Sequence, residues 1–305
     1  MKKVLAFLFW SIMLFFVYTY RVDITNYVIN NYIYKKEIVI PDSNEYKRNY
    51  DFLFVQETDN FYPKNIQDLY NVFYTILNNG YDSFTFYCDK EYKNCEKDIK
   101  NLISDETNQI LSSINNYVHP YNSYKSININ MNNLHRVTVK VEKLYSDSDI
   151  YALNNYINTV YARIIKPEMT DLEKIKTFHD FIIGIAKYDK TWVTLDSENR
   201  THKSNTAYGP LIEHIGLCGG YTDAMELFLE KAGIKSYKIA SDNHIWNYVY
   251  INNSWKHLDL TWDDPVTNTG RNILQYDYYL LDTITLENKK DNEHNYVKDY
   301  YLEAK

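Results

Sequence analysis

The feature that most constrains the fold is a helical pattern that begins at a glycine-flanked cysteine, Cys218, within residues 216–221. From residue 221 onward, apolar residues recur at spacings of three and four, which places them on one face of a helix. They are Tyr221, Ala224, Met225, Phe228, Leu229 and Ala232. Gly233 follows and is typical of a helix stop. The pattern therefore predicts that Cys218 lies in or beside the first turn of a buried helix.

This position favours a reactive thiol. The N–H groups of a first helical turn have no partner within the helix, and together with the helix dipole they stabilise a thiolate. The neighbouring glycines, including Gly219, are expected to leave the sulfur uncrowded and to let a substrate backbone approach closely. Cys218 is therefore a candidate nucleophile, provided that a base can reach it.

Three strands are predicted after this helix, at residues 236–240, 245–251 and 255–262. Asn252 and Asn253 suit a two-residue turn between the last two strands, because Asn tolerates positive φ. Such a turn sets the pairing of these two strands. A slip of one residue would move every side chain of a strand to the opposite face of the sheet.

In this register Tyr248 faces His257 and His244 faces Thr261. His244 and Asp259 then lie on one face as diagonal neighbours, about 7–8 Å apart at the backbone, so that their side chains can meet. The register therefore predicts a carboxylate that orients the imidazole of His244.

Four motifs in this region resemble those of the transglutaminase-like superfamily. They are YGPL at residues 208–211, GLCGGY at 216–221, HIWN at 244–247 and DLTWDDP at 259–265. The clear resemblance covers residues 165–270. It implies a papain-like core, in which the nucleophile helix packs on an antiparallel sheet that carries the histidine and the aspartate. It also implies that Cys218, His244 and Asp259 form the catalytic triad.

The resemblance implies a cysteine acyl-transfer enzyme that cleaves or cross-links amides through a thioester. Tyr208, Gly219 and Trp246 are candidates for the oxyanion site or the wall of the cleft. The expected partner is a protein or peptide substrate, with cell-envelope proteins among the expected substrates. No cofactor is expected, and no dense acidic loop indicates calcium. The alternative is a non-catalytic adhesion or assembly module that keeps the fold.

Other histidines in the sequence offer alternatives to His244 as the base. His257 is the alternative base, and a zinc site of Cys218, His244 and His257 is less consistent with a thiol at a helix start than covalent catalysis is. His179 lies on the apolar face of a predicted helix and reads as a core histidine, and His214 could line the cleft. His119 and His135 lack partners at metal-ligand spacing, so that no metal is expected.

The N-terminus indicates a membrane or secretory segment. Lys2 and Lys3 precede an apolar run at residues 4–17 that no small-x-small cleavage site follows. We expect an uncleaved transmembrane anchor over residues 1–20, with the body outside the cytoplasm. The alternatives for this segment are cleavage followed by secretion of the protein, and a buried helix of a soluble protein. Residues 21–46 are expected to form a stalk.

With 305 residues the chain has room for about two domains. Its 33 basic and 40 acidic residues disfavour nucleic acid as a partner. The predicted class is α+β, with an α+β accessory module at 47–148 before a transglutaminase-like domain at 149–305. Within the module and the helices after it, strands are predicted at 51–56, 83–87, 124–131 and 136–144, and helices at 65–77, 95–102, 106–118, 149–165 and 171–186. Thr170 and Glu173 have the spacing of a capping box at the start of the last of these helices.

The three cysteines are Cys88, Cys95 and Cys218. Cys88 and Cys95 flank a turn-like segment and are the natural disulfide pair outside the cytoplasm, which leaves Cys218 free. Two unpaired thiols are the alternative. Their spacing does not suit a zinc site.

Overall fold

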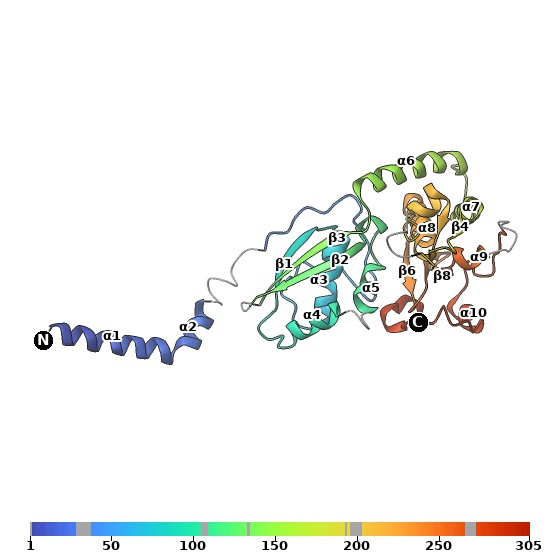
Figure 1. The fold of residues 1–305 in the computed structure, drawn as a ribbon. Coiled ribbons are helices and arrows are strands. Elements are labelled where there is room, and N and C mark those ends of the chain that lie inside the picture. The colour runs from blue at the N-terminus through green and yellow to red at the C-terminus, as the bar shows by residue number, and fades with distance from the viewer. Residues whose placement is uncertain are drawn as a thin grey trace.

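The computed structural model describes residues 2–28, 38–104, 109–132, 135–192, 194–195, 203–265 and 273–305. Helices and three small sheets make up the fold, as the sequence predicts (Figure 1). The helices are α1 (Lys2–Thr19), α2 (Arg21–Val28), α3 (Ile66–Asn78), α4 (Cys95–Ile103), α5 (Gln109–Asn115), α6 (Asp147–Ile164), α7 (Asp171–Ile185), α8 (Cys218–Ala232), α9 (Leu260–Asp263) and α10 (Thr283–Asn288). The strands are β1 (Ser83–Tyr87), β2 (Tyr124–Met131), β3 (Arg136–Lys143), β4 (Lys187–Tyr188), β5 (Ile215–Gly216), β6 (Ser236–Ala240), β7 (Ile245–Ile251) and β8 (Ser254–Leu258). Short helical turns are η2 (Pro120–Asn122), η4 (Gly209–Glu213), η5 (Lys298–Tyr300) and η6 (Leu302–Ala304).

The first sheet has the antiparallel order β1-β3-β2, and its buried face joins one hydrophobic cluster with α3, α4 and α5. Alternating buried residues on β1 and β3 supply this face. The predicted helix at 65–77 and the predicted strands of this sheet are confirmed. Residues 105–108 and 133–134, at the start of the predicted helix 106–118 and in the hairpin turn, lie outside the described residues.

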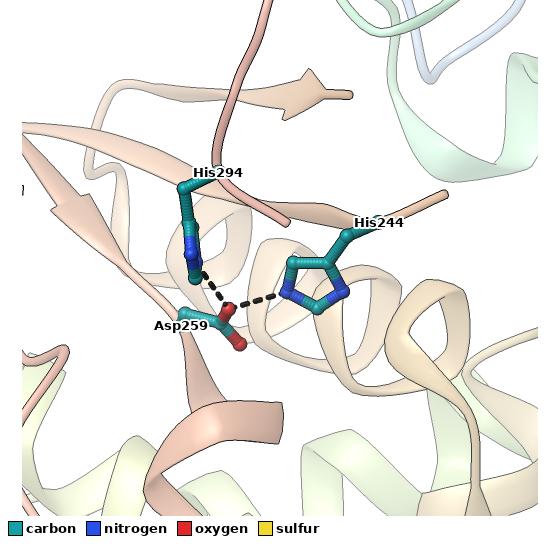
Figure 2. Close-up of side chains that lie close together, drawn as sticks. All are labelled: His244, Asp259 and His294. Atoms are coloured by element: carbon teal, nitrogen blue, oxygen red, sulfur yellow. Dashed lines mark hydrogen bonds and ion pairs between the residues drawn. The ribbon is translucent and has the colours of Figure 1, made fainter. Parts of the chain in front are cut away.

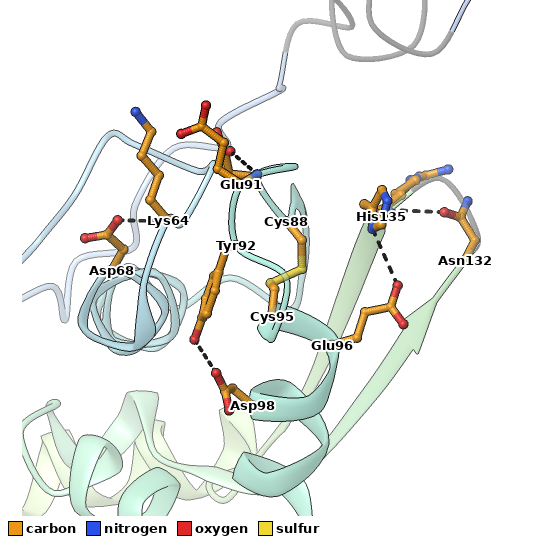
Figure 3. Close-up of a disulfide and its surroundings, with 12 residues drawn as sticks. Lys64, Asp68, Cys88, Glu91, Tyr92, Cys95, Glu96, Asp98, Asn132 and His135 are labelled. Carbon is orange, nitrogen blue, oxygen red and sulfur yellow. Dashed lines mark hydrogen bonds and ion pairs between the residues drawn. A yellow bond between two sulfur atoms is a disulfide. The ribbon is translucent and has the colours of Figure 1, made fainter. Parts of the chain in front are cut away.

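The predicted disulfide joins Cys88, just after β1, to Cys95, the first residue of α4 (Figure 3). Both cysteines are buried within the same hydrophobic cluster. His135, which the sequence left without a partner, lies beside this loop with its Nδ1 3.5 Å from Glu96 Oε1. Both of these side chains are about half exposed, so the contact is a surface pair.

The predicted strand at 51–56 is wrong. This segment is irregular, with the N–H of Phe52 bonded to the carbonyl of Val55. Phe52, Phe54 and Val55 are all buried. The apolar pattern therefore reflects a loop that packs its side chains into the core without pairing its backbone with a strand.

Capping residues set the starts of α6 and α7. Thr170 and Glu173 form the predicted capping box of α7. Ser146 caps α6 in the same way, and its side chain accepts a hydrogen bond from the N–H of Asp149. Helix α6 therefore begins at Asp147 rather than at the predicted residue 149. The helix starts earlier because Asp149 occupies the third position of a capping box instead of the first.

The third sheet has the antiparallel order β6-β7-β8, and α8 packs on β6 and β7. The predicted register is confirmed over the paired residues, from Ile251 with Ser254 to Asn247 with Leu258. The predicted pairing of His244 with Thr261 does not form. Asn252 and Asn253 form the turn, with φ of 52° and 58°. The predicted strand to residue 262 is wrong, because β8 ends at Leu258 and the next residue caps α9.

Both faces of this sheet are buried. Val249, Ile251 and Leu258 share a hydrophobic cluster with α6, α7 and α8. Tyr237 and Trp246 belong instead to the cluster of the first sheet. The segment predicted as an accessory module therefore shares a core with the β6-β7-β8 sheet.

Buried charges contact α8, and one of them, Arg48, comes from the segment predicted as an accessory module. Arg48 contacts Glu226 and Glu230 of α8, with 2.5 Å from Nε to Glu230 Oε1. Lys238 of β6 lies with its Nζ 2.9 Å from Asp223 Oδ1 of α8. The polar side of α8 is thus neutralised within the protein rather than by solvent.

The large apolar side chains of α1 and α2 are exposed, and Figure 1 shows both helices extending away from the rest of the chain. Among the described residues, no helix combines the length and the apolar character that crossing a bilayer requires. The expected transmembrane helix is therefore not supported. Residues 29–37 of the expected stalk lie outside the described residues.

Candidate active site

Cys218 is the first residue of α8, with Leu217 in the extended conformation of an N-cap. It is the free cysteine and is partly exposed, so that a substrate can reach its sulfur. Because it opens the helix, its backbone N–H has no acceptor within α8. The N–H of Leu217 is 2.7 Å from the carbonyl oxygen of Ser204, which holds an adjacent loop against the start of the helix.

The glycines after Cys218 make room for this loop. A Cβ at Gly219 would lie 2.4 Å from Asn205 Oδ1, and one at Gly220 would lie 2.3 Å from the carbonyl oxygen of Ser204. Residues 203–206 therefore pack directly on the first turn of α8. This packing is a structural reason for the glycines that the sequence did not reveal. Residues 196–202, which precede this loop, lie outside the described residues.

His244 and Asp259 meet in the protein interior (Figure 2). His244 precedes β7, and its Nε2 lies 2.5 Å from Asp259 Oδ2. Asp259 caps α9, where its Oδ1 accepts the N–H groups of Thr261 at 2.8 Å and Trp262 at 3.2 Å. Both His244 and Asp259 are buried. The cap, rather than a continued strand, fixes the direction of the carboxylate.

Cys218 also interacts with His244. Burial disfavours the imidazolium, but the charge and hydrogen bond of Asp259 and a hydrogen bond with the Cys218 side chain outweigh it and raise the pKa of His244 to about 10. Burial likewise works against the Asp259 carboxylate, yet His244 and a second histidine hold the pKa of Asp259 well below its usual range. At neutral pH the site therefore contains an imidazolium beside an ionised carboxylate.

The second histidine is His294, which the sequence analysis did not identify. Its Nε2 lies 2.9 Å from Asp259 Oδ2 and its Nδ1 lies 2.7 Å from Asp291 Oδ1. Figure 2 shows His244 and His294 reaching the same carboxylate oxygen from different segments. The three-residue spacing between Asp291 and His294 is the sequence signal that could have pointed to this histidine. It is too common to single out the residue.

The ligand atoms of His244, Asp259 and His294 lie within 4.8 Å of one another, as in a possible metal site. The nitrogens of His244 and His294 are 2.5 Å and 2.9 Å from the shared oxygen. Ligands of one tetrahedral zinc, each about 2.0–2.2 Å from the ion, would be more than about 3 Å apart. The contacts in this structure are therefore those of hydrogen bonds.

Trp246 does not occupy the expected position at the site. The side chain of Trp246 is buried behind His244, with ring centroids 5.7 Å apart, because both faces of β7 are covered. It is therefore a packing residue rather than a wall of an open cleft. Tyr208 precedes η4, and Lys203 lies 4.6 Å from its ring centroid. Asn205 instead is the polar side chain that lies against Gly219 at the start of α8.

His257 turns away from the cysteine. Its Nδ1 accepts the indole N–H of Trp246 at 3.0 Å, and its Nε2 lies 3.3 Å from Thr283 Oγ1. Burial and the charge of His294 lower the pKa of His257 to about 3. It is a neutral packing residue, suited neither to the base role nor to the zinc set that the sequence left open.

The remaining histidines have structural surroundings. His179 is fully buried, with Nε2 3.1 Å from Asp263 Oδ2 and Nδ1 3.0 Å from Asp180 Oδ1, as expected for a satisfied core histidine. His119 Nδ1 accepts the N–H of Tyr121 at 3.1 Å at the start of η2. His214 is exposed, ends η4 and has a φ of 61°.

Comparisons with known proteins bear mainly on the fold. No protein-family model and no curated protein matches the chain. Among solved structures it is similar to a TGase, with 13% identity and a TM-score of 0.33 over 49% of this chain and 47% of that one. It is also similar to a provisionally assigned cysteine protease from Cytophaga hutchinsonii, with 13% identity and a TM-score of 0.28 over 49% of this chain and 65% of that one. Neither solved chain is matched over two thirds of its length.

Proposed function

We propose that this chain is an extracytoplasmic cysteine acyl-transfer enzyme of the transglutaminase-like kind, acting on amides of proteins or peptides. One observation carries the proposal: a partly exposed thiol opens α8 and raises the pKa of a buried histidine, whose Nε2 contacts a buried carboxylate. Cys218, His244 and Asp259 thus lie in series. A nucleophile, a base and a group that orients the base are the elements that covalent acyl transfer requires.

In the first half-reaction the sulfur of Cys218 attacks the amide carbonyl carbon. His244 takes the proton of the thiol during this attack, or the two groups already rest as an ion pair. As the carbon–nitrogen bond breaks, His244 donates this proton to the leaving amine, and a thioester remains on Cys218. Asp259 stabilises the imidazolium until that transfer.

In the second half-reaction water or an amine attacks the thioester. Neutral His244 removes a proton from the attacking group, the carbon–sulfur bond breaks, and the thiolate–imidazolium pair is restored. Water yields a carboxylic acid, whereas a lysine amine yields an isopeptide cross-link. The backbone N–H of Cys218, free of an acceptor within α8, is the first donor for the oxyanion.

The extracytoplasmic setting is part of the proposal. It is supported by the Cys88–Cys95 disulfide, because such bonds persist mainly in oxidising compartments. The disulfide also leaves Cys218 as the thiol available for labelling. Protein substrates outside the cytoplasm, including those of the cell envelope, are the expected partners.

Alkylation of Cys218 by iodoacetamide at pH 6 tests the proposal. An ordinary thiol, with a pKa near 8.5, is less than about 1% ionised at that pH. The ion pair should therefore react on the order of 10²-fold faster than an ordinary thiol. His244→Ala should remove this advantage.

The matched control is His214→Asn, which changes an exposed histidine near Cys218 and keeps a residue that tolerates positive φ. It should label as fast as the wild type. Slow labelling that His244→Ala does not change would contradict the enzyme and favour the non-catalytic assembly module. Incubation with a labelled amine and a glutamine-containing peptide, followed by mass spectrometry, then separates cross-linking from hydrolysis.

A further inference from the structure

The segment after α10 brings a second imidazole to the carboxylate of the site. His294 shares Asp259 Oδ2 with His244 and reaches Asp291 Oδ1 through its other nitrogen. Its side chain is only 3% exposed. A carboxylate oxygen accepts but does not donate, so each nitrogen of His294 has to carry a proton to bond there. The imidazolium is the form that satisfies both contacts.

Aromatic rings hold His294 in this orientation. Its ring centroid lies 4.7 Å from that of Trp246 and 4.8 Å from the nearly parallel ring of Tyr278. The titratable groups that face it come from five segments. They are Asp291 on its own segment, Asp259 at α9, His244 before β7, His257 on β8 and Tyr278 before α10.

A positive charge at His294 would act on several of these groups. It would lower the pKa of Asp259 and of Asp291 against the opposing effect of burial. Together with burial, it would also lower the pKa of His257.

We propose that His294 is a positioning residue of the cysteine site: as a buried imidazolium it bridges Asp259 and Asp291, directs the shared oxygen toward His244 and balances the charge of Asp259. This inference rests on the proposed acyl-transfer function. It adds two residues, His294 and Asp291, to the series of Cys218, His244 and Asp259.

The charge balance has a chemical consequence. The ring centroids of His244 and His294 are 5.2 Å apart. With His294 charged, Asp259 stabilises the His244 imidazolium less strongly, so that His244 gives up its proton to a leaving amine more readily. Without that charge, the pKa of His244 should be higher by roughly one to two pH units.

The first test measures the charge of His294 without using activity. In ¹⁵N-histidine-labelled protein, both ring nitrogens of His294 should be protonated from pH 6 to pH 8, with the signals assigned through their loss in His294→Gln. His257 serves as the internal reference for a neutral ring, because its Nδ1 accepts a hydrogen bond from Trp246. A neutral His294 in this range would overturn the proposal.

The second test compares His294→Gln with the wild type. Glutamine can still donate a hydrogen bond to Asp259 but carries no charge. In the pH profile of Cys218 alkylation, the limb at which His244 loses its proton should move upward by about one pH unit or more. A folded His294→Gln protein with an unchanged profile would show that the residue acts by packing alone and would overturn the proposal.

His179→Gln is the matched control, because His179 is also buried between two carboxylates but does not contact Cys218, His244 or Asp259 through any of its ring nitrogens. It should leave the alkylation profile in place. Stoichiometric binding of zinc alone that His294→Gln abolishes would instead identify a metal site and overturn the proposal. Slow alkylation insensitive to His244 would reject the enzyme function, whereas the ¹⁵N spectra would still report the charge of His294.

Discussion

At the residue scale, the site is defined by opposite shifts in two coupled groups. Burial lowers the pKa of His244, but Asp259 and Cys218 outweigh it and raise this pKa to about 10. That of Asp259 falls well below its usual value, also against burial. A raised histidine pKa stabilises the folded state fully below the unfolded value, about 6.5, and this stability is lost as the pH rises toward 10. The lowered carboxyl pKa stabilises the fold above about 3.8 and loses this effect as the pH falls further.

This linkage predicts how the effect of removing His244 depends on pH. His244→Gln should lower Tm most at pH 6, and the gap to the wild type should narrow steadily between pH 7 and pH 10. Each kcal/mol of lost coupling corresponds to about 2–4 °C in a domain of 150–250 residues, so a gap of several degrees at pH 6 is expected. Calorimetry at half-unit pH intervals measures it. A gap that stays constant across this range would contradict the assigned charge of His244.

At the element scale, the start of α8 depends on the close approach of residues 203–206. A Cβ at Gly220 would meet a backbone oxygen, that of Ser204, whereas one at Gly219 would meet the end of the Asn205 side chain, which can rotate away. The backbone oxygen cannot move without breaking its bond to the N–H of Leu217. A Cβ is therefore harder to accommodate at Gly220 than at Gly219.

We expect Gly220→Ala to destabilise the protein by about 1–3 kcal/mol, because it overpacks the contact between the loop and the helix. It should also slow the alkylation of Cys218. Gly184→Ala is the matched control, because a Cβ there meets nothing within 4 Å and the residue lies inside α7. It should stabilise by about 0.5–1 kcal/mol. Urea unfolding measures both, and equal losses in the two variants would count against the packing explanation.

At the scale of the whole molecule, α8 is held by charges from outside the region that resembles the transglutaminase-like proteins. Arg48 is buried and reaches Glu226 and Glu230, and its Nη1 lies 2.9 Å from the carbonyl oxygen of Tyr117. The carboxylate of Glu226 is buried as well and accepts the amide of Asn247 at 2.9 Å. The nucleophile helix is thereby linked to the segment before α3 and to β7.

Arg48→Met should therefore destabilise the whole protein by about 3–5 kcal/mol, because it leaves the Glu226 carboxylate buried without its cation. Lys125→Met is the matched control. It breaks an exposed pair with Glu142, and such pairs contribute little to stability. Denaturant unfolding followed by fluorescence provides the measurement. A loss for Arg48→Met as small as that of the control would mean that the two parts are not energetically coupled through this pair.

The sequence by itself determined the local structure. The apolar period and Gly233 predicted α8 and its end, the two asparagines predicted the turn and the register of β7 with β8, and the capping box predicted the start of α7. These signals lie within a few residues of what they determine, because helix periodicity, turn geometry and caps are set by neighbouring residues. The disulfide followed from spacing and an odd number of cysteines.

The tertiary structure decided how distant residues meet. That β8 stops at Leu258 depends on the N–H of Asp259 bonding to Tyr278, and the loss of a predicted strand near Phe52 depends on core packing. Likewise, the contact of Arg48 with α8 and that of His294 with Asp259 join residues that lie far apart in the sequence. Their energies come from burial and from charges paired across separate segments, and no local pattern in the sequence encodes which segments will be brought together.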